Sequence, residues 1–431
     1  MRPGAHIRAA VEVLEEVLGR HRPAAQALAD WGKSHRFAGS GDRAAIGNLV
    51  YDALRRRRSL AARMGSDASR AIVLAAAPQA LGLSEAAVAA SADGSPYAVE
   101  PLSAAERAGL ERSLPADAPA SVRGDFPDWL EPSFARAFGE AAAAEGAALA
   151  RRAPVDLRVN TLKADRDKVL KALARFGAGP TPLSPVGVRL PAPEGAGRQP
   201  NVEAEVAHGR GWYEVQDEGS QLAALMAGAG PRQQVLDICA GAGGKTLAFA
   251  AAMGNTGQVY AYDEQAQRLR PILERLKRAG VRNAQVLAAG DRTALAALGP
   301  RFDLVFVDAP CTGTGAWRRR PDAKWRLKPA NLAQRVEEQR EVLALAQAMV
   351  KPGGRLVYAT CSVLPEENGD QVGWLRATHS GLALVPWREA WAAGVGGEPP
   401  LSADGSDDTL LLTPARHGTD GFFIAVLTRG S

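Results

Sequence analysis

The sequence has few cysteines and no long apolar segment. Only Cys239, Cys311 and Cys361 occur in 431 residues. A secreted disulfide framework needs more cysteines at closer spacing, and no two of these stand at the C-x-x-C spacing of a structural zinc site. No apolar run approaches the roughly 18 residues that span a bilayer, and residues 1–10 lack the apolar core of a signal peptide. We therefore expect a cytoplasmic monomer without a metal or a membrane span.

Length and charge indicate a multi-domain protein with a nucleic-acid partner. A length of 431 residues suggests two or three domains of about 150 residues each. The formal net charge is +5, and residues 1–70 hold 13 Lys and Arg against 7 Asp and Glu. Four of these cations form the run Arg55–Arg58. This run is either a solvated helix face or a surface that contacts phosphates, and both interpretations stay open.

The first half of the chain divides into a helical part and a mixed part. Residues 1–130 show apolar residues at helical spacing, with a loop expected at 87–101 and a linker region at 115–132, and a plain helix is expected at 133–149. Residues 150–225 combine strand patterns at 155–159, 187–190 and 211–215 with a helix at 166–176. We expect a helical domain over 1–130 and a linker helix plus a small α+β module over 131–228.

From residue 229 to residue 431 strands alternate with helices, which predicts an α/β domain with a mainly parallel sheet covered on both faces. Helices are expected at 264–279 and 331–350. The expected strands are 234–239, 258–263, 284–288, 303–308, 355–360 and 422–427.

A glycine-rich turn after the first of these strands predicts a nucleoside cofactor. The turn reads Cys239-Ala240-Gly241-Ala242-Gly243-Gly244-Lys245-Thr246 and leads into a helix, whose first N–H groups are free to meet a ligand. A phosphate-binding P-loop needs glycine where Cys239 stands, and a dinucleotide fingerprint needs glycine where Thr246 stands. Both fail by one residue, which leaves a nucleoside cofactor without phosphates.

Three acids follow the next strands and support that interpretation. Asp263 ends the second strand, where a carboxylate can accept the ribose hydroxyls. Asp291 follows the third strand, where it can reach an adenine edge, and Asp308 ends the fourth. Such folds bind ligands at the carboxyl edge of the sheet. The alternative is that one or two of these acids only cap helices.

The cysteines are expected to meet at the same edge. Cys239, Cys311 and Cys361 follow the first, fourth and fifth strands, and the carboxyl ends of adjacent parallel strands lie side by side. A thiolate beside a methyl donor suits one reaction in particular. Addition of the thiolate to carbon 6 of a pyrimidine turns carbon 5 into a nucleophile. Asp308 stands where it could protonate or hydrogen-bond the ring N3. Both reacting thiols would then need a lowered pKa, with Lys245 supplying positive charge.

At this point the motifs resemble the RNA cytosine-C5 methyltransferases of the Sun/NOP (RsmB-like) family. In chain order the motifs are D-x-C-A-x-x-G-G-K-T, D-A-P-C-T-G-T-G, R-R-P-D-A-K-W, K-P-G-G, T-C-S-x-x-x-x-E-N and H-G-T-D-G-F-F, and the resemblance covers about residues 150–431. The resemblance implies a Rossmann-like class I methyltransferase domain, with S-adenosylmethionine as cofactor and RNA as partner. Small-subunit rRNA is the expected substrate and tRNA the alternative.

The resemblance also implies roles for individual residues. Cys361 is the nucleophile, and Cys311 assists breakdown of the covalent adduct, with Asp308 and Lys245 beside them. Ala242 stands where the family usually has proline, which suggests a looser turn. The residues implied to hold S-adenosylmethionine are Cys239, Ala240, Gly241, Ala242, Gly243, Gly244, Lys245, Asp263, Arg268, Asp291 and Asp308.

Weaker resemblances concern the rest of the chain. The helical N-terminus resembles a NusB-like RNA-binding domain, and the middle module resembles an RRM-like segment with Arg158-Val159-Asn160-Thr161 as its signature. The basic segment 318–328 has six Lys and Arg, with Trp317 and Trp325 beside and within it. Because it follows D-A-P-C, we expect it to flank the target base, with a solvated loop as the alternative.

Two other functions are considered. A DNA cytosine-C5 methyltransferase would use the cysteine after the fourth strand and would not need Thr360-Cys361-Ser362. A non-catalytic ribosome-assembly factor could keep the fold, but intact Cys361, Asp308 and Lys245 argue against it.

Overall fold

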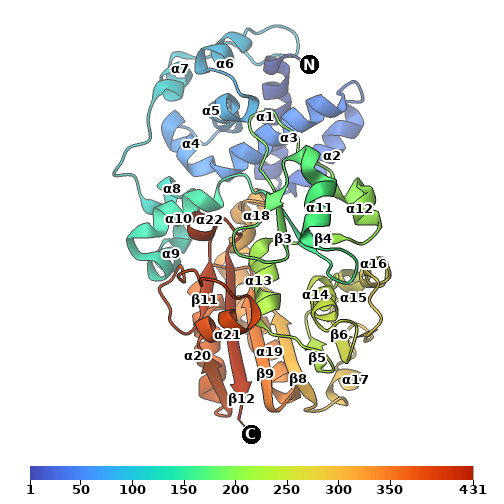
Figure 1. The fold of residues 1–431 in the computed structure, drawn as a ribbon. Helices are drawn as coiled ribbons and strands as arrows, with labels where there is room; N and C mark the ends of the chain where they lie inside the picture. The colour runs from blue at the N-terminus through green and yellow to red at the C-terminus, as the bar shows by residue number, and fades with distance from the viewer. Residues whose placement is uncertain (431) are drawn as a thin grey trace. The chain divides into compact units, whose positions relative to one another are not determined.

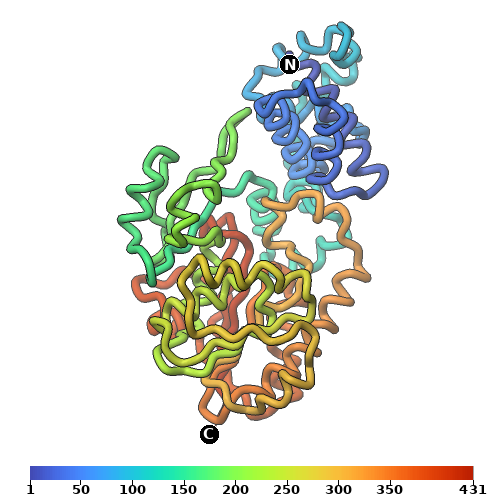
Figure 2. Tube along the Cα trace, turned by 90° about the vertical axis from the view of Figure 1, so that its right-hand side faces the viewer, coloured from blue at the N-terminus to red at the C-terminus, as the bar shows by residue number. Residues whose placement is uncertain are grey.

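The computed structural model describes residues 1–430, which form two compact units. The first unit consists of 1–153, 192–199 and 317–327, and the second of 154–191, 200–316 and 328–431. Figure 2 shows how the excursions at 192–199 and 317–327 leave the later chain and run against the N-terminal helices. Asn48 Nδ2 donates to the carbonyl of Gly197 at 2.9 Å within this first unit.

The first unit is helical, as the spacing of its apolar residues predicts. Its core is built from buried side chains such as Leu14, Ile46, Leu49 and Ile72. No β-strand occurs between residues 1 and 153. The helices are α1 (Pro3–Gly19), α2 (Ala24–Ser34), α3 (Ser40–Arg55), α4 (Arg57–Met64), α5 (Ser69–Leu81), α6 (Glu85–Ser91), α7 (Ala104–Glu111), α8 (Ala120–Arg123), η1 (Asp128–Leu130), α9 (Glu131–Phe138), η2 (Gly139–Ala141), α10 (Ala142–Leu149) and the late α18 (Pro321–Arg326).

Two expectations for this unit are wrong. The loop expected at 87–101 begins as a helix, because Ser84 caps α6 by accepting a hydrogen bond from the Ala87 N–H at 3.1 Å. The plain helix expected at 133–149 is broken between α9 and α10. Gly139 adopts φ +55° at the break, a left-handed conformation that glycine takes without steric cost.

The arginine run is mostly used inside the first unit. Arg55 pairs with the buried Asp52 at 2.8 Å, and Arg58 pairs with Asp128. Burial lowers the pKa of both Arg55 and Arg56. These side chains are not a row of free cations, and the phosphate-contacting interpretation of the run is wrong for Arg55 and Arg56.

The second unit contains a small antiparallel sheet with the strand order β2-β3-β1-β4. The strands are β1 (Val155–Val159), β2 (Gly179–Pro180), β3 (Gly187–Leu190) and β4 (Tyr213–Val215), with α11 (Arg166–Leu173), η3 (Ala174–Phe176), η4 (Val202–Ala204) and α12 (Val206–Gly209) beside them. The strands and helix expected from the alternating pattern are confirmed, whereas the sequence pattern did not predict the two-residue β2, η4 or α12. Leu157, Val169, Leu173 and Val188 form its separate core.

The large sheet has the order β10-β12-β9-β8-β5-β6-β7, with β11 paired to β12. Strands β5 to β9 run parallel to one another, whereas β12 runs antiparallel to β9, β10 and β11. The strands are β5 (Gln234–Asp237), β6 (Gln258–Ala261), β7 (Ala284–Val286), β8 (Phe302–Asp308), β9 (Val350–Thr360), β10 (Leu382–Val385), β11 (Leu410–Leu412) and β12 (Phe422–Arg429). A mainly parallel, Rossmann-like sheet is confirmed.

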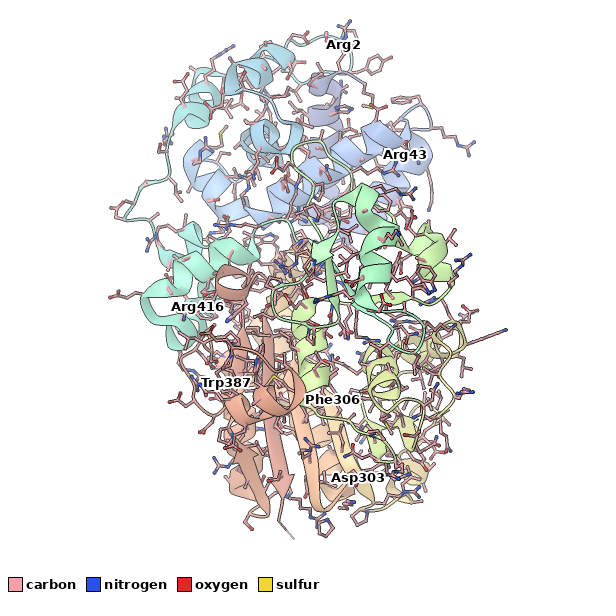
Figure 3. All side chains as sticks on the ribbon, in the orientation of Figure 1. Arg2, Arg43, Asp303, Phe306, Trp387 and Arg416 are labelled. Carbon is pink, nitrogen blue, oxygen red and sulfur yellow. The ribbon has the colours of Figure 1, made fainter. Side chains whose placement is uncertain are left out.

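Helices cover this sheet, with α13 and α21 in front of it and α19 behind it in Figure 1. Phe306 on β8 and Trp387 on α21 share one buried core (Figure 3). The helices are α13 (Glu218–Met226), α14 (Gly244–Ala252), α15 (Ala266–Leu269), α16 (Ile272–Ala279), α17 (Arg292–Ala296), η5 (Thr314–Ala316), α19 (Pro329–Met349), η6 (Pro365–Glu367), α20 (Gly369–Thr378), α21 (Trp387–Gly394) and α22 (Pro414–His417).

The single helix expected at 264–279 is two helices, α15 and α16. Pro271 stands at the N-cap of α16 and has no N–H to continue the hydrogen bonds of α15. Over residues 1–430, no helix has the length and apolar character required to cross a membrane.

Candidate active site

The glycine-rich turn joins β5 to α14 as expected. Gly243 is the N-cap of α14 at φ +85°, and a Cβ there would lie 2.6 Å from Ile272 Cγ1, so a side chain would be both strained and crowded. The Gly243 N–H closes the turn on the Ala240 carbonyl at 2.8 Å. Arg275 Nη1 donates to the carbonyl of Ala242 at 2.8 Å. The turn is therefore tied down at Ala242 although proline is absent.

The acids after the strands surround this turn. Asp263 is 2% exposed and accepts hydrogen bonds from the N–H groups of Gly241 and Gln265, both at 2.9 Å. Arg268 Nη1 lies 3.6 Å from Asp263 Oδ2. Asp291 is exposed and caps α17, because its Oδ1 accepts a hydrogen bond from the Ala294 N–H at 2.8 Å. For this oxygen, the alternative that the acid caps a helix is confirmed.

Asp237 adds a further carboxylate that the sequence interpretation did not use. It is fully buried at the end of β5, and Oδ2 accepts from the Thr246 hydroxyl at 2.7 Å. Its Oδ1 is buried without a hydrogen-bond partner among the described residues. Burial, together with the nearby Asp308 and against the hydrogen bond from Thr246, raises the pKa of Asp237 to about 7. An unpaired buried acceptor of this kind suits a cationic ligand group such as an ammonium.

Lys245 links the turn to the reacting edge. Its Nζ donates to Asp308 Oδ2 at 2.9 Å and to Ser220 Oγ at 2.7 Å, and it lies 5.0 Å from the ring centroid of Phe422. The Lys245 side chain is 4% exposed, whereas that of Asp308 is 34% exposed. Asp308 therefore neutralises the one lysine of the turn and still presents an open face.

The donor set fits S-adenosylmethionine better than a phosphate ligand. Lys245 is already paired with Asp308, the half-exposed Arg268 lies 3.6 Å from Asp263, and one oxygen of Asp237 has no partner among the described residues. This balance disfavours phosphates and favours a ligand with sulfonium and ammonium charges. No cluster of three or more His, Cys, Asp or Glu side chains suited to a metal ion occurs in residues 1–430.

The two cysteines expected to react lie in contact. Strands β8 and β9 are parallel neighbours, with Asp308 opposite Ala359, and Cys311 Sγ lies 3.4 Å from Cys361 Sγ. The contact with Cys361, burial and the charge of Glu367 hold the pKa of Cys311 well above its usual range. The expectation that both thiols have a lowered pKa is wrong for Cys311. Burial, with Asp263 and the other acids, also raises the pKa of Cys239.

Two adjacent residues, Glu367 and Asn368, hold the two cysteine turns. Glu367 is fully buried and accepts hydrogen bonds from the N–H and hydroxyl of Thr312, the residue after Cys311. Asn368 accepts from the Thr360 hydroxyl at 2.6 Å and donates to the Ser362 carbonyl at 3.0 Å, on either side of Cys361. The sequence motif contains this E-N pair but does not indicate what it does. The feature that could have identified its role is its position shortly after T-C-S in the same motif.

Gln339 on α19 completes the hold on the Cys311 turn. Its Nε2 donates to the Pro310 carbonyl at 2.9 Å and to Glu367 at 3.1 Å. The tail motif H-G-T-D-G-F-F packs closely against the same region. A Cβ on Gly315 would lie only 2.0 Å from the Gly421 carbonyl oxygen, so the two backbones touch. The Gly315 N–H also donates to the Cys361 carbonyl at 3.0 Å. The two loops and the tail thus form one hydrogen-bonded assembly.

The signature of the small module contacts the cofactor turn. Arg158 on β1 is buried, and its Nη1 donates to the Gly244 carbonyl at 2.7 Å. Asn160 Nδ2 donates to the carbonyls of Gly211 and Ala279, both at 2.8 Å. These two residues join the small sheet to α14 and α16, a structural role that the sequence interpretation missed.

The basic segment 318–328 is not a stacking surface. Trp317 is 1% exposed and stacks on Phe134 at 6.1 Å between centroids. Trp325 donates to the Leu54 carbonyl at 2.6 Å, and the buried Lys324 donates to the Arg55 carbonyl at 2.8 Å. These side chains build the first unit, so the expectation that the tryptophans stack on RNA bases is wrong.

The fold and this site define a Rossmann-like methyltransferase. Residues 225–428 match the family model "16S rRNA methyltransferase RsmB/F", and 126–195 match the RsmF/B-like ferredoxin-like domain. The probable ribosomal RNA small subunit methyltransferase B of Synechocystis sp. is 34% identical over 70% of this chain and 67% of its own length. The enzyme of that name from Pseudomonas syringae pv. tomato is 36% identical over 72% and 66%. The chain belongs to the RsmB/F family of rRNA methyltransferases.

Solved structures agree on the fold. The crystal structure of PH0851 covers 99% of both chains at 25% identity with a TM-score of 0.73. The structure of NSun6 from Pyrococcus horikoshii with SFG covers 71% of this chain at 22% identity with a TM-score of 0.62. The chain aligns with about two thirds of the length of the curated relatives, at 67%, 65% and 66% for the first three.

Proposed function

We propose that this chain transfers a methyl group from S-adenosylmethionine to carbon 5 of a cytosine in small-subunit rRNA, with Cys361 as the nucleophile. The observation that carries the proposal is the 3.4 Å contact between Cys311 and Cys361 at the ends of two adjacent parallel strands. Two thiols beside the Lys245–Asp308 pair suit a reaction that makes and then breaks a bond to sulfur.

S-adenosylmethionine, when bound, supplies the methyl group on a positively charged sulfur. The residues proposed to hold it are the turn from Cys239 to Lys245, together with Asp263, Arg268, Asp291 and Asp308. Within this set, the buried Asp263 fixes the turn through Gly241, and the unpaired oxygen of Asp237 offers an acceptor for an ammonium group. We also propose that the chain divides into domains after residues 130 and 228.

Cys361 begins the proposed reaction at the base. Its thiolate adds to carbon 6, so that an Sγ–C6 bond forms and the electron pair of the C5–C6 double bond becomes available at carbon 5. In the proposed step, a proton on the open face of Asp308 is donated in a hydrogen bond to the lone pair of the ring N3, which stabilises that electron shift. After carbon 5 has gained the methyl group, a base removes the proton from carbon 5. The C–H electrons restore the double bond, and the Sγ–C6 bond breaks.

Cys311 serves the second half of this sequence. It lies against Cys361, and that contact together with burial raises the pKa of its thiol, so Cys311 carries the proton in the proposed sequence. A proton-bearing neighbour can hydrogen-bond the departing sulfur and so favour release of the methylated base. The DNA-enzyme alternative assigns these roles in reverse.

Bisulfite sequencing tests the proposal directly. Small-subunit rRNA and tRNA are incubated with S-adenosylmethionine and either the wild-type chain or Cys361→Ala. We expect one or a few newly protected cytosines in rRNA with the wild-type chain and none with the variant. Protection confined to tRNA, or methyl incorporation without protected cytosines, would overturn the substrate or the carbon-5 assignment.

A further inference from the structure

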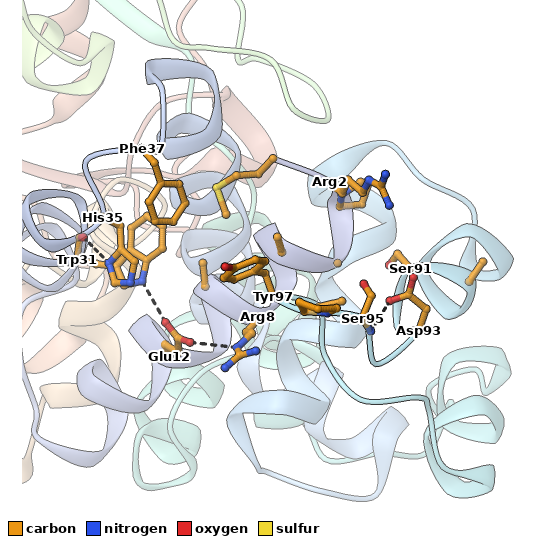
Figure 4. Close-up of a pocket in the computed structure, with 18 residues that line it drawn as sticks. Arg2, Arg8, Glu12, Trp31, His35, Phe37, Ser91, Asp93, Ser95 and Tyr97 are labelled. Carbon is orange, nitrogen blue, oxygen red and sulfur yellow. Dashed lines mark hydrogen bonds and ion pairs between the residues drawn. The ribbon is translucent and has the colours of Figure 1, made fainter.

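A groove of about 910 Å³ opens in the first unit between the start of α1, the end of α2 and the turn that follows α6. Figure 4 shows Trp31, His35 and Phe37 together on one side of it and Tyr97 facing them from the other. Its volume lies at the upper end of the roughly 300–1,000 Å³ of small-ligand pockets. Neither the cofactor turn nor the two cysteine loops contribute to this groove.

The walls of the groove are aromatic rings that solvent can reach. Trp31 and His35 stack at 4.2 Å with 9° between their planes, and Phe37 packs edge-on against His35 at 5.8 Å. Phe37 is 70% exposed and Tyr97 74% exposed. Tyr97 also adopts φ +78°, which is rare for a residue with a side chain and costs free energy. A strained, exposed tyrosine opposite a ring stack is better explained by a ligand than by packing.

The remaining lining favours planar ligands over aliphatic ones. None of the groove residues is Leu, Ile or Val, and most of the others are Ala, Pro, Gly or Ser. A groove for an apolar peptide helix needs deep aliphatic contacts, whereas flat rings with small residues between them accept stacked bases of any sequence.

The charges at the groove suit a polyanion. Arg2 in its lining and Arg36, which lies in sequence between the lining residues His35 and Phe37, are exposed. The two acids of the lining are engaged. Glu12 accepts from Trp31 Nε1 at 3.2 Å and pairs with Arg8 at 3.4 Å, and Asp93 accepts from the Ser95 N–H at 3.0 Å.

We infer that this groove binds an unpaired stretch of the RNA substrate, with bases stacked on Phe37, Tyr97 and the Trp31–His35 pair and phosphates beside Arg2 and Arg36. The inference rests on the proposed function, because it takes the groove's RNA to be the RNA that the chain methylates. It replaces the arginine run and the segment 318–328 as the expected RNA contact of the first unit.

Fluorescence anisotropy with a labelled single-stranded RNA of mixed sequence tests the stacking. Phe37→Ala and Tyr97→Ala remove exposed rings, and Leu401→Ala, also 70% exposed, is the matched control outside the groove. We expect the full-length chain to bind RNA on the order of tenfold more weakly for each ring removed, with the control unchanged. Equal affinity in the double variant Phe37→Ala/Tyr97→Ala and the wild type would overturn the inference.

Salt dependence tests the charges separately. The double variant Arg2→Gln/Arg36→Gln should reduce the slope of log affinity against log salt by about 0.7 for each phosphate that the variant no longer neutralises. An unchanged slope would remove these arginines from the site.

Methylation kinetics separates the groove from the proposed function. If both hold, the ring variants raise KM for rRNA and leave kcat unchanged. If the wild-type chain methylates rRNA and the ring variants have its KM, the groove does not serve the substrate and a protein partner becomes the better occupant. If the wild-type chain does not methylate rRNA but the ring variants still lose RNA affinity, the proposed function fails while RNA binding in the groove stands.

Discussion

Cys311 and Cys361 carry the same thiol, follow neighbouring strands and touch each other, yet different side chains hold their turns. A buried carboxylate, Glu367, binds the residue after Cys311, whereas a neutral amide, Asn368, binds the residues on both sides of Cys361. Contact with Cys361 and burial, and then the charge of Glu367, raise the pKa of Cys311. The comparison teaches that adjacent residues of one motif can hold two identical side chains through different chemical groups.

The largest expected effect comes from removing each thiol in turn. Cys361→Ala cannot form the bond to carbon 6, so methylation should fall to background. Cys311→Ala should still attack and methylate but release slowly, because the departing sulfur has lost its hydrogen-bonding neighbour. We expect Cys311→Ala to accumulate a protein–RNA species that survives denaturing gel electrophoresis. A trapped species in Cys361→Ala and none in Cys311→Ala would reverse the two roles.

Replacing Glu367 or Asn368, which hold the two cysteine turns, should reproduce these phenotypes in weaker form. Glu367→Ala frees the Cys311 turn and leaves the Thr312 N–H without its acceptor, so it should slow release and trap some RNA. Asn368→Ala frees the Cys361 turn and should slow methylation without trapping. A displacement of about 1 Å costs up to roughly a hundredfold in rate, which sets the scale for both. Single-turnover methyl transfer and denaturing gels measure the two steps. Identical behaviour of the two variants would mean that Glu367 and Asn368 do not serve different steps.

The meeting of the two thiols was predictable from the sequence, because β8 and β9 each read as a buried strand followed directly by a cysteine motif. Parallel neighbours place those ends at one edge whatever the details of the loops. What the sequence could not reveal is which charged residues are consumed internally. Arg55 and Trp317 look like RNA-contacting residues, but their partners Asp52 and Phe134 are identified only by the folded chain. The break at Pro271 was readable, since proline cannot continue α15.

Asp263→Ala should affect both thiols alike and thereby act as a reference for the comparison. Loss of its hydrogen bonds to the turn and of its contribution to the ribose site should weaken S-adenosylmethionine binding by about 1.5–3 kcal/mol. Isothermal titration calorimetry measures this change. Methylation should fall at limiting cofactor without a trapped RNA species. Unchanged affinity would remove Asp263 from the cofactor site, and trapping would show that slow release is not particular to the Cys311 side.

The smallest and sharpest test separates the charge of Glu367 from its hydrogen bonds. In Glu367→Gln the amide oxygen can still accept from the Thr312 N–H and from Gln339, and the Thr312 hydroxyl can turn to accept from the new NH₂ group. The turn is therefore held while the negative charge is gone. Because a nearby anion opposes a thiolate, its removal should lower the pKa of Cys311, and the thiol should become reactive at lower pH. Rates of iodoacetamide modification of Cys311 across a pH series, assigned by mass spectrometry, measure this shift. Glu367→Ala serves as the comparison, because it loses both the negative charge and the hydrogen bonds that hold the Cys311 turn. A pH profile for Cys311 that is the same in Glu367→Gln and in the wild-type chain would mean that contact with Cys361 and burial alone keep the proton on Cys311.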